Sequence, residues 1–250
     1  MKFIRVGTAG WNVPTMLAHR CGTAGSHLER YAAMMNCVEV NSSFYRPHQR
    51  KIWQKWAAAT PPDFKFAVKA PKAVTHVAKL LNCGDALAQF FEQIAGLDEK
   101  LGPLLLQLAP GHAFDHGVAR DFLGMLREIH RGPVALEPRN ASWFTPEADH
   151  LLLEFNLARV VADPAKGSFL VAKPGGAKEL RYYRLHGSPR VYWSAYDAAQ
   201  IESLAAELID YEFGYESGES WVIFDNTALG YATANAVWLH DALRQEHSGR

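Results

Sequence analysis

Short apolar runs alternate along this chain with longer segments whose apolar residues recur every three or four positions. Short apolar runs are typical of buried strands, and the longer repeat is typical of amphipathic helices. Eight segments have the strand pattern: 3–10, 37–41, 64–70, 102–108, 133–139, 158–163, 180–187 and 220–226. Seven segments have the helix pattern: 26–35, 50–58, 85–97, 115–130, 145–155, 197–213 and 234–245.

Local signals mark where two of these helices begin. Ser26 and Glu29 have the spacing of a capping box, in which each residue satisfies a free amide of the first turn. Thr145 fits an N-cap, and Pro146 fits the first helical position that follows it. Both signals agree with the periodicity.

Alternation of strands and helices predicts an α/β protein with a parallel sheet. The length of 250 residues and the count of eight strands favour a single-domain, closed (β/α)₈ TIM barrel over residues 1–246, with a frayed tail at 247–250. An open doubly wound sheet is the alternative. It more often carries a GxGxxG turn, of which "GTAGW" has only the first half.

Composition and charge narrow the range of partners and locations. The formal net charge is zero, whereas a protein that holds nucleic acid mainly through phosphates usually has a basic excess. A local basic patch would still allow nucleic acid. The three cysteines, Cys21, Cys37 and Cys83, form no CxxC pair, which suits a reducing cytosol and gives no zinc motif. We found neither a membrane-spanning apolar stretch nor a signal peptide, so we expect a cytoplasmic protein with no membrane partner.

Polar residues gather at the carboxyl ends of the predicted strands, where barrels of this kind place their chemistry. Because burying an unpaired charge costs several kcal/mol, a cluster of ionisable groups at one rim favours a solvated pocket that uses them. The alternative is that these groups pair among themselves and hold the barrel mouth. The residues are Trp11, Glu39, Asn41, Tyr45, Lys69, His76, Gln107, Glu137, Arg139, Trp143, Asp163, Arg184, His186, Asp225 and Asn226.

Three of these residues are candidates for proton transfer: Glu39, Glu137 and His186. An adjacent arginine lowers a carboxyl pKa, so Glu137 beside Arg139 is expected to be an ionised base or orienting group. Glu39 and His186 are then the better candidates for the acid.

The other rim residues are candidates for substrate binding. Lys69, Arg139 and Arg184 supply positive donors, and arginine suits bidentate contact with phosphate or carboxylate. Aromatic residues near the strand ends could stack on sugars or bases, with packing over the mouth as the alternative for each: Trp11, Tyr45, Trp143, Tyr192 and Trp193. The predicted substrate-binding set is Trp11, Asn41, Tyr45, Lys69, His76, Gln107, Arg139, Trp143, Arg184 and Asn226.

The same residues carry a resemblance to a known family. The motifs are VGTAGW (6–11), YAAMMNCVEVNSSFYRPH (31–48), WAAATPPDFKFAVKAPKAVTH (56–76), LGPLLLQLAP (101–110), LEPRNASW (136–143), YYRLHG (182–187) and FDNTALGYATANAVWL (224–239). In this order they resemble the YecE-like family, known as domain of unknown function 72. The resemblance implies a TIM barrel, and it names no reaction because the function of the family is not established.

The chain departs from the family pattern at three places. Asn12 follows the "GW" pair where the family more often has serine, and Pro138 stands where it more often has phenylalanine. Asp225 precedes Asn226 where the family often has two asparagines. Asp225 therefore adds an acid or metal ligand that most members would lack.

Three functions fit the candidate residues. The favoured one is an enzyme that acts on a phosphorylated or sugar-containing substrate by acid/base chemistry. The second is a metal-dependent phosphodiesterase resembling endonuclease-type barrels, since Glu39, Glu137, Asp163, His186 and Asp225 are suitable ligand types for a divalent metal, although no metal-binding spacing supports it. The third is a non-catalytic barrel that binds nucleic acid or a metabolite. The sequence leaves catalysis itself and the oligomeric state open.

Overall fold

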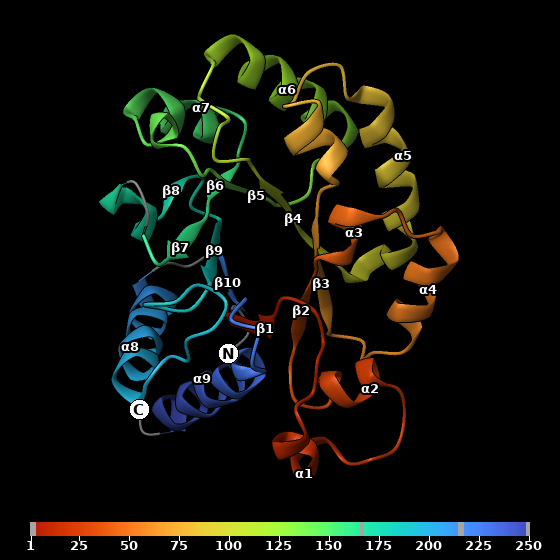
Figure 1. The fold of residues 1–250 in the computed structure, drawn as a ribbon, viewed down its shortest axis with the longest axis vertical. Coiled ribbons are helices and arrows are strands. Elements are labelled where there is room, and N and C mark those ends of the chain that lie inside the picture. Colours follow the sequence, from red (N-terminus) through yellow and green to blue (C-terminus); the bar gives the residue numbers. More distant parts are fainter. Residues whose placement is uncertain (1–3, 166–167, 215–217, 249–250) are drawn as a thin grey trace.

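The computed structural model describes residues 4–165, 168–214 and 218–248. The strands are β1 (Ile4–Thr8), β2 (Cys37–Val40), β3 (Lys65–Lys69), β4 (Leu101–Gln107), β5 (Val134–Glu137), β6 (Ala158–Arg159), β7 (Val161–Asp163), β8 (Gly175–Gly176), β9 (Leu180–Leu185) and β10 (Glu219–Phe224). The α-helices are α1 (Ala18–Cys21), α2 (His27–Ala32), α3 (Ser42–Tyr45), α4 (Arg50–Ala58), α5 (Gly84–Ile94), α6 (His116–Ile129), α7 (Pro146–Glu154), α8 (Ala198–Gly214) and α9 (Tyr231–Ser248). Figure 1 shows the helices around the outside of the strands.

All eight predicted strands and all seven predicted helices are present, although segment 158–163 is divided into β6 and β7. The pattern did not predict the two-residue strand β8 or the one-turn helices α1 and α3. These elements are too short to show a period. Helix α9 continues to Ser248, within the predicted tail, and residues 249–250 lie outside the described residues.

Both predicted helix starts are confirmed. The Ser26 side chain accepts from the Glu29 amide, and the Glu29 carboxylate accepts from the Ser26 amide, so the capping box of α2 is complete. The Thr145 hydroxyl accepts from the amide of Ala148, with Pro146 at the first position of α7. These side chains satisfy amides that lack partners within the helix.

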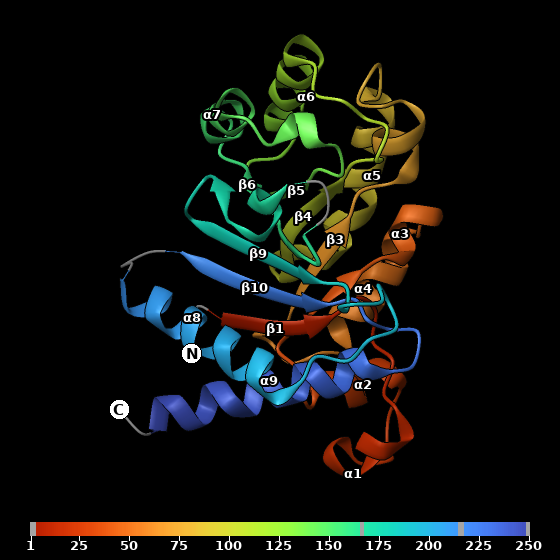
Figure 2. The same ribbon diagram turned by 60° about the vertical axis from the view of Figure 1, so that its left-hand side comes forward.

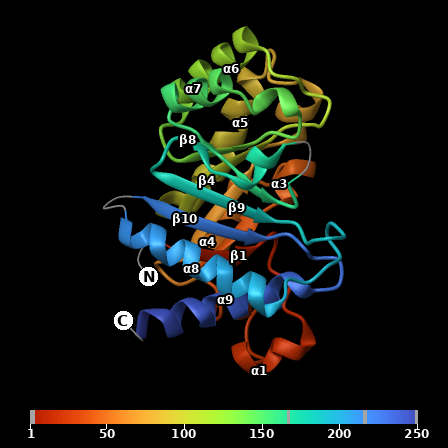
Figure 3. The same cartoon turned by 90° about the vertical axis from the view of Figure 1, so that its left-hand side faces the viewer.

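The strands form two sheets. One has the order β1-β10-β9-β7, and the other has the order β2-β3-β4-β5-β6-β8. Every pair of neighbours is parallel except β6 and β8. Figures 2 and 3 show β1, β10 and β9 side by side, with α8 and α9 along them. The prediction of a single α/β domain with parallel strands is therefore confirmed, but that of a closed (β/α)₈ barrel is not.

Side chains explain why the sheets do not join fully between β1 and β2. The Tyr31 hydroxyl accepts from the amide of Thr8 at 2.8 Å, and the Asn36 side chain accepts from the amide of Val6 at 2.9 Å. These contacts use amides of β1 that a neighbouring strand would otherwise bind. Among the described residues, the backbones of the two sheets meet here in one isolated bridge, Ala9 to Glu39.

Two apolar clusters lie on opposite faces of the strands. The larger one fills the space between strands and helices and includes Val38, Leu106 and Phe224. The smaller one, which we call the inner cluster, includes Ala135 and Trp221. Successive side chains of a strand point to opposite faces, so strands such as β3, β4 and β5 contribute to both clusters. Across the part of the chain described, no helix is both long and apolar enough to cross a membrane.

Candidate functional site

The inward-facing side chains change from apolar to polar toward the carboxyl ends of the strands. Cys37, Ala67 and Ala135 belong to the inner cluster, and the residue two positions later points to the same face. At that later position the strands carry charged or amide side chains. With His186, they form a set that we call the polar layer: Glu39, Lys69, Gln107, Glu137, Arg184, His186 and Asp225.

Arg184 lies at the centre of the polar layer and is fully buried. Its Nε and Nη2 donate to the two oxygens of Glu39 at 3.0 and 2.7 Å. Its Nη1 donates to Glu137 at 2.8 Å, and its Nη2 also donates to Asp225 at 3.0 Å. The Tyr182 hydroxyl donates to Glu39 at 2.8 Å. One guanidinium therefore holds three buried carboxylates in place.

His186 bridges two of these carboxylates. Its Nδ1 lies 3.0 Å from Asp225, and its Nε2 lies 3.0 Å from Glu137. Burial alone lowers the pKa of His186, but hydrogen bonds to Asp225 and Glu137 more than offset this effect and raise it. An imidazolium would donate to both carboxylates, whereas Arg139 Nη2, which lies 3.2 Å from Nε2, can donate only to a neutral ring. The ring of Tyr192 lies edge-on to His186, with the ring centres 5.9 Å apart.

Glu137 collects donors from several strands. The Gln107 amide donates to it at 2.8 Å, and Arg139 Nη2 forms an ion pair with it at 2.8 Å. Burial alone raises the pKa of the Glu137 carboxyl. The charge of Arg184, the hydrogen bond from the neighbouring imidazole and the charge of Arg139 together hold it well below its usual range. The prediction of an ionised carboxylate beside Arg139 agrees with this direction.

Lys69 differs from the other charged members of the polar layer. Its side chain is buried, with the residue only 8% exposed, and its ammonium lies 4.4 Å from the centre of the Phe44 ring. The ammonium forms no hydrogen bond and no ion pair with any described residue. Burial, with the charge of Arg184 as the next cause, lowers the pKa of Lys69, although the charges of Glu39, Glu137 and Asp225 oppose this.

A cavity of about 180 Å³ adjoins the polar layer. Arg139 and His186 line it, together with apolar groups that include Pro138 and Val171. The Arg139 side chain is 29% exposed, and its Nε is buried without a hydrogen-bond partner in the described region. A small ligand here would meet one cation with a spare donor and one bridged imidazole.

Three other predicted site residues lie near the strand ends. His76 packs with its ring centre 4.9 Å from that of Phe44, and burial and then the charge of Lys69 lower the His76 pKa. Asn41 and Asn226 each have a buried side-chain oxygen with no partner in the described part of the chain. The Asn226 amide also donates to a carbonyl of the loop after β9 at 2.9 Å.

The structure does not bring the predicted aromatic residues together. Trp143 is 1% exposed and donates to the carbonyl of His112, so it packs in the core and presents no face to a ligand. Trp11 packs edge-on against Trp56 with ring centres 5.0 Å apart. Tyr45 is 79% exposed and lines a different cavity, outside the strands.

The carboxylates of the polar layer do not fit a divalent metal. No group of three or more His, Cys, Asp or Glu residues among the described ones is placed to hold one. Arg184 binds Glu39, Glu137 and Asp225, so a guanidinium occupies the position where a metal would share them. Asp163, another candidate ligand, accepts a tyrosine hydroxyl at 2.7 Å.

Sequence reasoning missed one residue of this region, Tyr182. The Tyr182 hydroxyl donates to Glu39. Tyr182 lies two residues before Arg184 on the same strand, and this spacing was a signal that its side chain faces inward. Tyr192, one of the aromatic candidates from the sequence, lies in the loop after β9 and contacts the His186 ring edge-on, with a φ of 69°, a conformation uncommon outside glycine. No period in the sequence marks such a loop position.

The fold and the polar layer define a class: a single-domain α/β protein whose parallel strands present buried ion pairs at their carboxyl ends. Residues 5–250 match the family model described as "Protein of unknown function DUF72", and the chain belongs to this family. The predicted resemblance is thus confirmed. The family description names no activity.

Known relatives and structures agree with this membership. The chain is similar to UPF0759 protein YunF of Bacillus subtilis, with 24% identity over 98% of this chain and 96% of that protein. It is 32% identical to UPF0759 protein YecE of Escherichia coli over 105 residues, which are 42% of this chain and 37% of that protein.

The solved structures of DUF72 proteins have the same fold. The Enterococcus faecalis protein superposes with a TM-score of 0.78 at 21% identity, covering 96% of this chain and 95% of that chain. The Thermotoga maritima protein gives a TM-score of 0.77 at 23% identity, covering 97% of this chain and 99% of that chain.

Proposed function

We propose that this protein is an enzyme that acts by proton transfer on a small substrate bearing a phosphate or carboxylate group. The observation that carries the proposal is Lys69, a buried ammonium without an ion-pair or hydrogen-bond partner among the described residues. An ammonium that is largely removed from water and has no direct partner is costly. An anionic ligand beside Lys69 would remove that cost.

The charges of the site support an anionic ligand. The polar layer has three carboxylates, and Arg184, Arg139 and a protonated His186 supply three positive charges that contact them. Lys69 adds a fourth positive charge, so the site has a net charge of +1 before a ligand binds. An anion between Lys69 and Arg139 would also give a partner to the free Nε of Arg139.

The proton-transfer roles follow from the contacts. His186 holds a proton between two carboxylates and faces the cavity, so it is the proposed general acid. Glu137 is ionised and shares that proton, so it is the proposed base that returns it. Glu39 is fully buried and bound by Arg184 and Tyr182, so we assign it a positioning role instead of the acid role expected from the sequence.

The two sheets are also proposed to act as one barrel. Segment 158–163 pairs with β5 through its first half and with β9 through its second half. The bridge between Ala9 and Glu39 links β1 to β2 on the other side. This arrangement would bring the carboxyl ends of all these strands to one mouth, where barrels carry their active sites.

The test begins with ligand binding and proceeds to turnover. Phosphosugars, nucleotides, abasic DNA, small carboxylates and divalent metals are screened by thermal shift, since a ligand that binds only the folded state raises Tm. Each ligand that raises Tm is then incubated with wild type, His186→Asn, Glu137→Gln and the surface control Lys51→Met. We expect turnover by wild type and control, and a loss of at least about a hundredfold in the two site variants. Full activity in both site variants would overturn the assignment, and binding without turnover would make the protein a binding module.

A further inference from the structure

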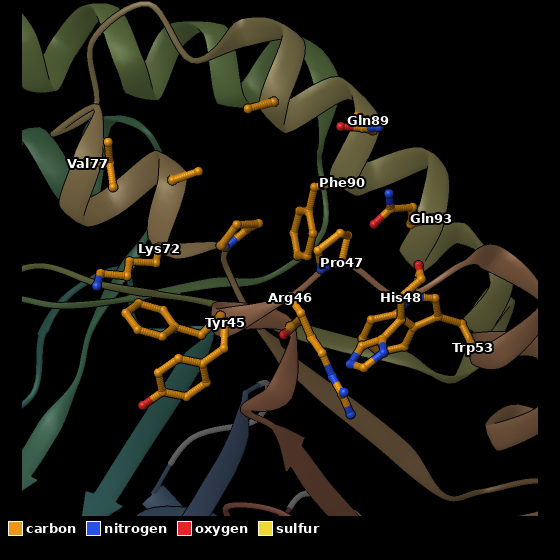
Figure 4. A pocket seen from close by; sticks show the side chains of 15 residues that line it. Tyr45, Arg46, Pro47, His48, Trp53, Lys72, Val77, Gln89, Phe90 and Gln93 are labelled. Carbon is orange, nitrogen blue, oxygen red and sulfur yellow. Dashed lines mark hydrogen bonds between the residues drawn. The ribbon is translucent and has the colours of Figure 1, made fainter.

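A second cavity, of about 300 Å³, lies outside the strands (Figure 4). It is formed by α3 and the segment that follows it, by the turn 71–77 after β3, and by α5. Its walls include Phe44, Tyr45, Pro47 and Phe90. Its volume is at the lower end of the range for small-molecule sites, and its aromatic and proline walls are flat.

The polar groups around this second cavity lack partners. The Arg46 guanidinium, the Lys72 ammonium and the side-chain amides of Gln89 and Gln93 make no hydrogen bond or ion pair with any described residue. Arg46, Lys72 and Gln89 are exposed, and Gln93 is half-buried on the wall formed by α5. No Asp or Glu is among the described residues that line the cavity. The cavity therefore combines apolar walls with free cations and free amides.

We infer that this cavity binds a nucleotide, with the base between its walls and the phosphate at Arg46 and Lys72. A nucleobase is planar and apolar on its faces, which suits packing beside Tyr45 and Phe90. Its edge carries donors and acceptors, and a glutamine amide such as that of Gln93 offers both. Two unpaired cations and the absence of acids on the described lining favour an anionic ligand.

An aliphatic acid is a weaker match for the second cavity. It would satisfy Arg46 and Lys72 and would bury apolar surface. However, it would leave the amides of Gln89 and Gln93 without partners on the cavity wall, and unpaired polar groups reduce affinity when a ligand excludes water from them. The nucleotide uses all three kinds of group that line the cavity.

The second cavity adjoins the polar layer without being part of it. Phe44 lines the cavity, while the same ring lies 4.4 Å from the Lys69 ammonium. None of the carboxylates of the polar layer lines this cavity. Nucleotide binding here is thus independent of the proposed catalysis, and a variant such as Glu137→Gln should leave it intact.

The experiment is a titration with adenosine 5′-monophosphate, followed by calorimetry and by the fluorescence of Trp53, which lines the cavity. We expect binding to wild type to weaken about tenfold or more in Arg46→Ala/Lys72→Ala, and several-fold in Gln93→Leu. Lys51→Ala, an exposed residue of α4 outside the lining, is the matched control and should bind as wild type does. Glu137→Gln should also bind normally.

Comparison ligands separate the parts of the nucleotide. Adenosine lacks the phosphate and ribose 5-phosphate lacks the base, so each should bind about tenfold or more weakly than the nucleotide. Equal binding of ribose 5-phosphate would reduce the site to an anion site and overturn the base assignment. Equal binding of octanoate would make the cavity a site for apolar acids. Binding that is lost in Glu137→Gln and kept in Arg46→Ala/Lys72→Ala would move the nucleotide to the polar layer and overturn the inference.

Discussion

Substitution of Lys69 by methionine should make the protein more stable while it weakens anion binding. Desolvation of a charged amine costs several kcal/mol, and the contact with Phe44 returns at most about 2 kcal/mol. Methionine retains an unbranched apolar side chain that fits the same buried space. We expect Lys69→Met to raise the free energy of unfolding by about 1–3 kcal/mol. For a chain of this size, the corresponding rise in Tm is roughly 2–12 °C.

The effect of Lys69→Met should depend on pH in a defined direction. Burial, followed by the charge of Arg184, lowers the pKa of Lys69 in the folded state, while the unfolded value stays near 10.4. Between these two values the unfolded state binds more protons, so the stability of wild type rises with pH there. The stability difference between variant and wild type is therefore full below the folded pKa and shrinks as pH rises toward about 10.4.

Urea denaturation at a series of pH values measures this difference, with Lys51→Met as the exposed-lysine control. The control should change the free energy of unfolding by less than about 0.5 kcal/mol at every pH. Thermal shift with phosphate or sulfate measures anion binding, and the rise in Tm should be present in wild type and absent in Lys69→Met. A typical substitution destabilises a protein by about 1 kcal/mol. If Lys69→Met were less stable than wild type by about that much or more, and anion binding were unchanged, Lys69 would be a structural residue and the reasoning would be refuted.

Other substitutions test the surrounding structure. Arg184→Met leaves the carboxylates of the polar layer without their shared cation, so urea denaturation should show a free energy of unfolding lower by about 3–5 kcal/mol. A decrease of less than about 1 kcal/mol would contradict the central role of Arg184. Burial alone lowers the pKa of His186, but its two carboxylate neighbours raise the pKa above the unfolded value of about 6.5. The contribution of His186 to stability is therefore full below about pH 6.5 and disappears as pH rises through the folded pKa. The stability difference between wild type and His186→Gln should therefore shrink at alkaline pH, and a constant difference in urea midpoints would refute this. In Gly7→Ala the new Cβ would lie 2.3 Å from the carbonyl oxygen of Cys37. Thermal melting should therefore show a free energy of unfolding lower by about 1–3 kcal/mol. An unchanged Tm would contradict the close approach of β1 and β2.

The periodicity of the sequence was sufficient to predict the principal elements, because each strand and helix follows local rules. The capping box at Ser26 is one example, since both partners lie within one turn of helix. The joining of the sheets depends on distant residues. The side chains of Tyr31 and Asn36 bind the edge of β1, and neither contact leaves a period or motif in the sequence.

The sequence was sufficient to predict which residues lie at the candidate site, but not which partners each of them binds. A period of two places Glu39, Glu137 and Arg184 on the inner face near the strand ends, and this follows from the sequence alone. Burial of Trp143 does not follow, because it depends on the packing of loops that are far apart in the chain. The sequence therefore indicates which residues belong to the polar layer, but it cannot indicate which of them lack partners.

The difference between cations that are bound by carboxylates and cations without partners determines how the polar layer relates to function. Arg184 and Lys69 are both cations of the polar layer, and from the sequence alone both were expected to bind substrate. In the structure Arg184 is bound by three carboxylates, whereas Lys69 has none within ion-pair distance among the described residues. A saturated cation stabilises the site, and an unsaturated cation remains able to bind an anion. The difference between their variants, large destabilisation for Arg184 and stabilisation for Lys69, therefore separates the structural part of this layer from the part proposed to bind substrate.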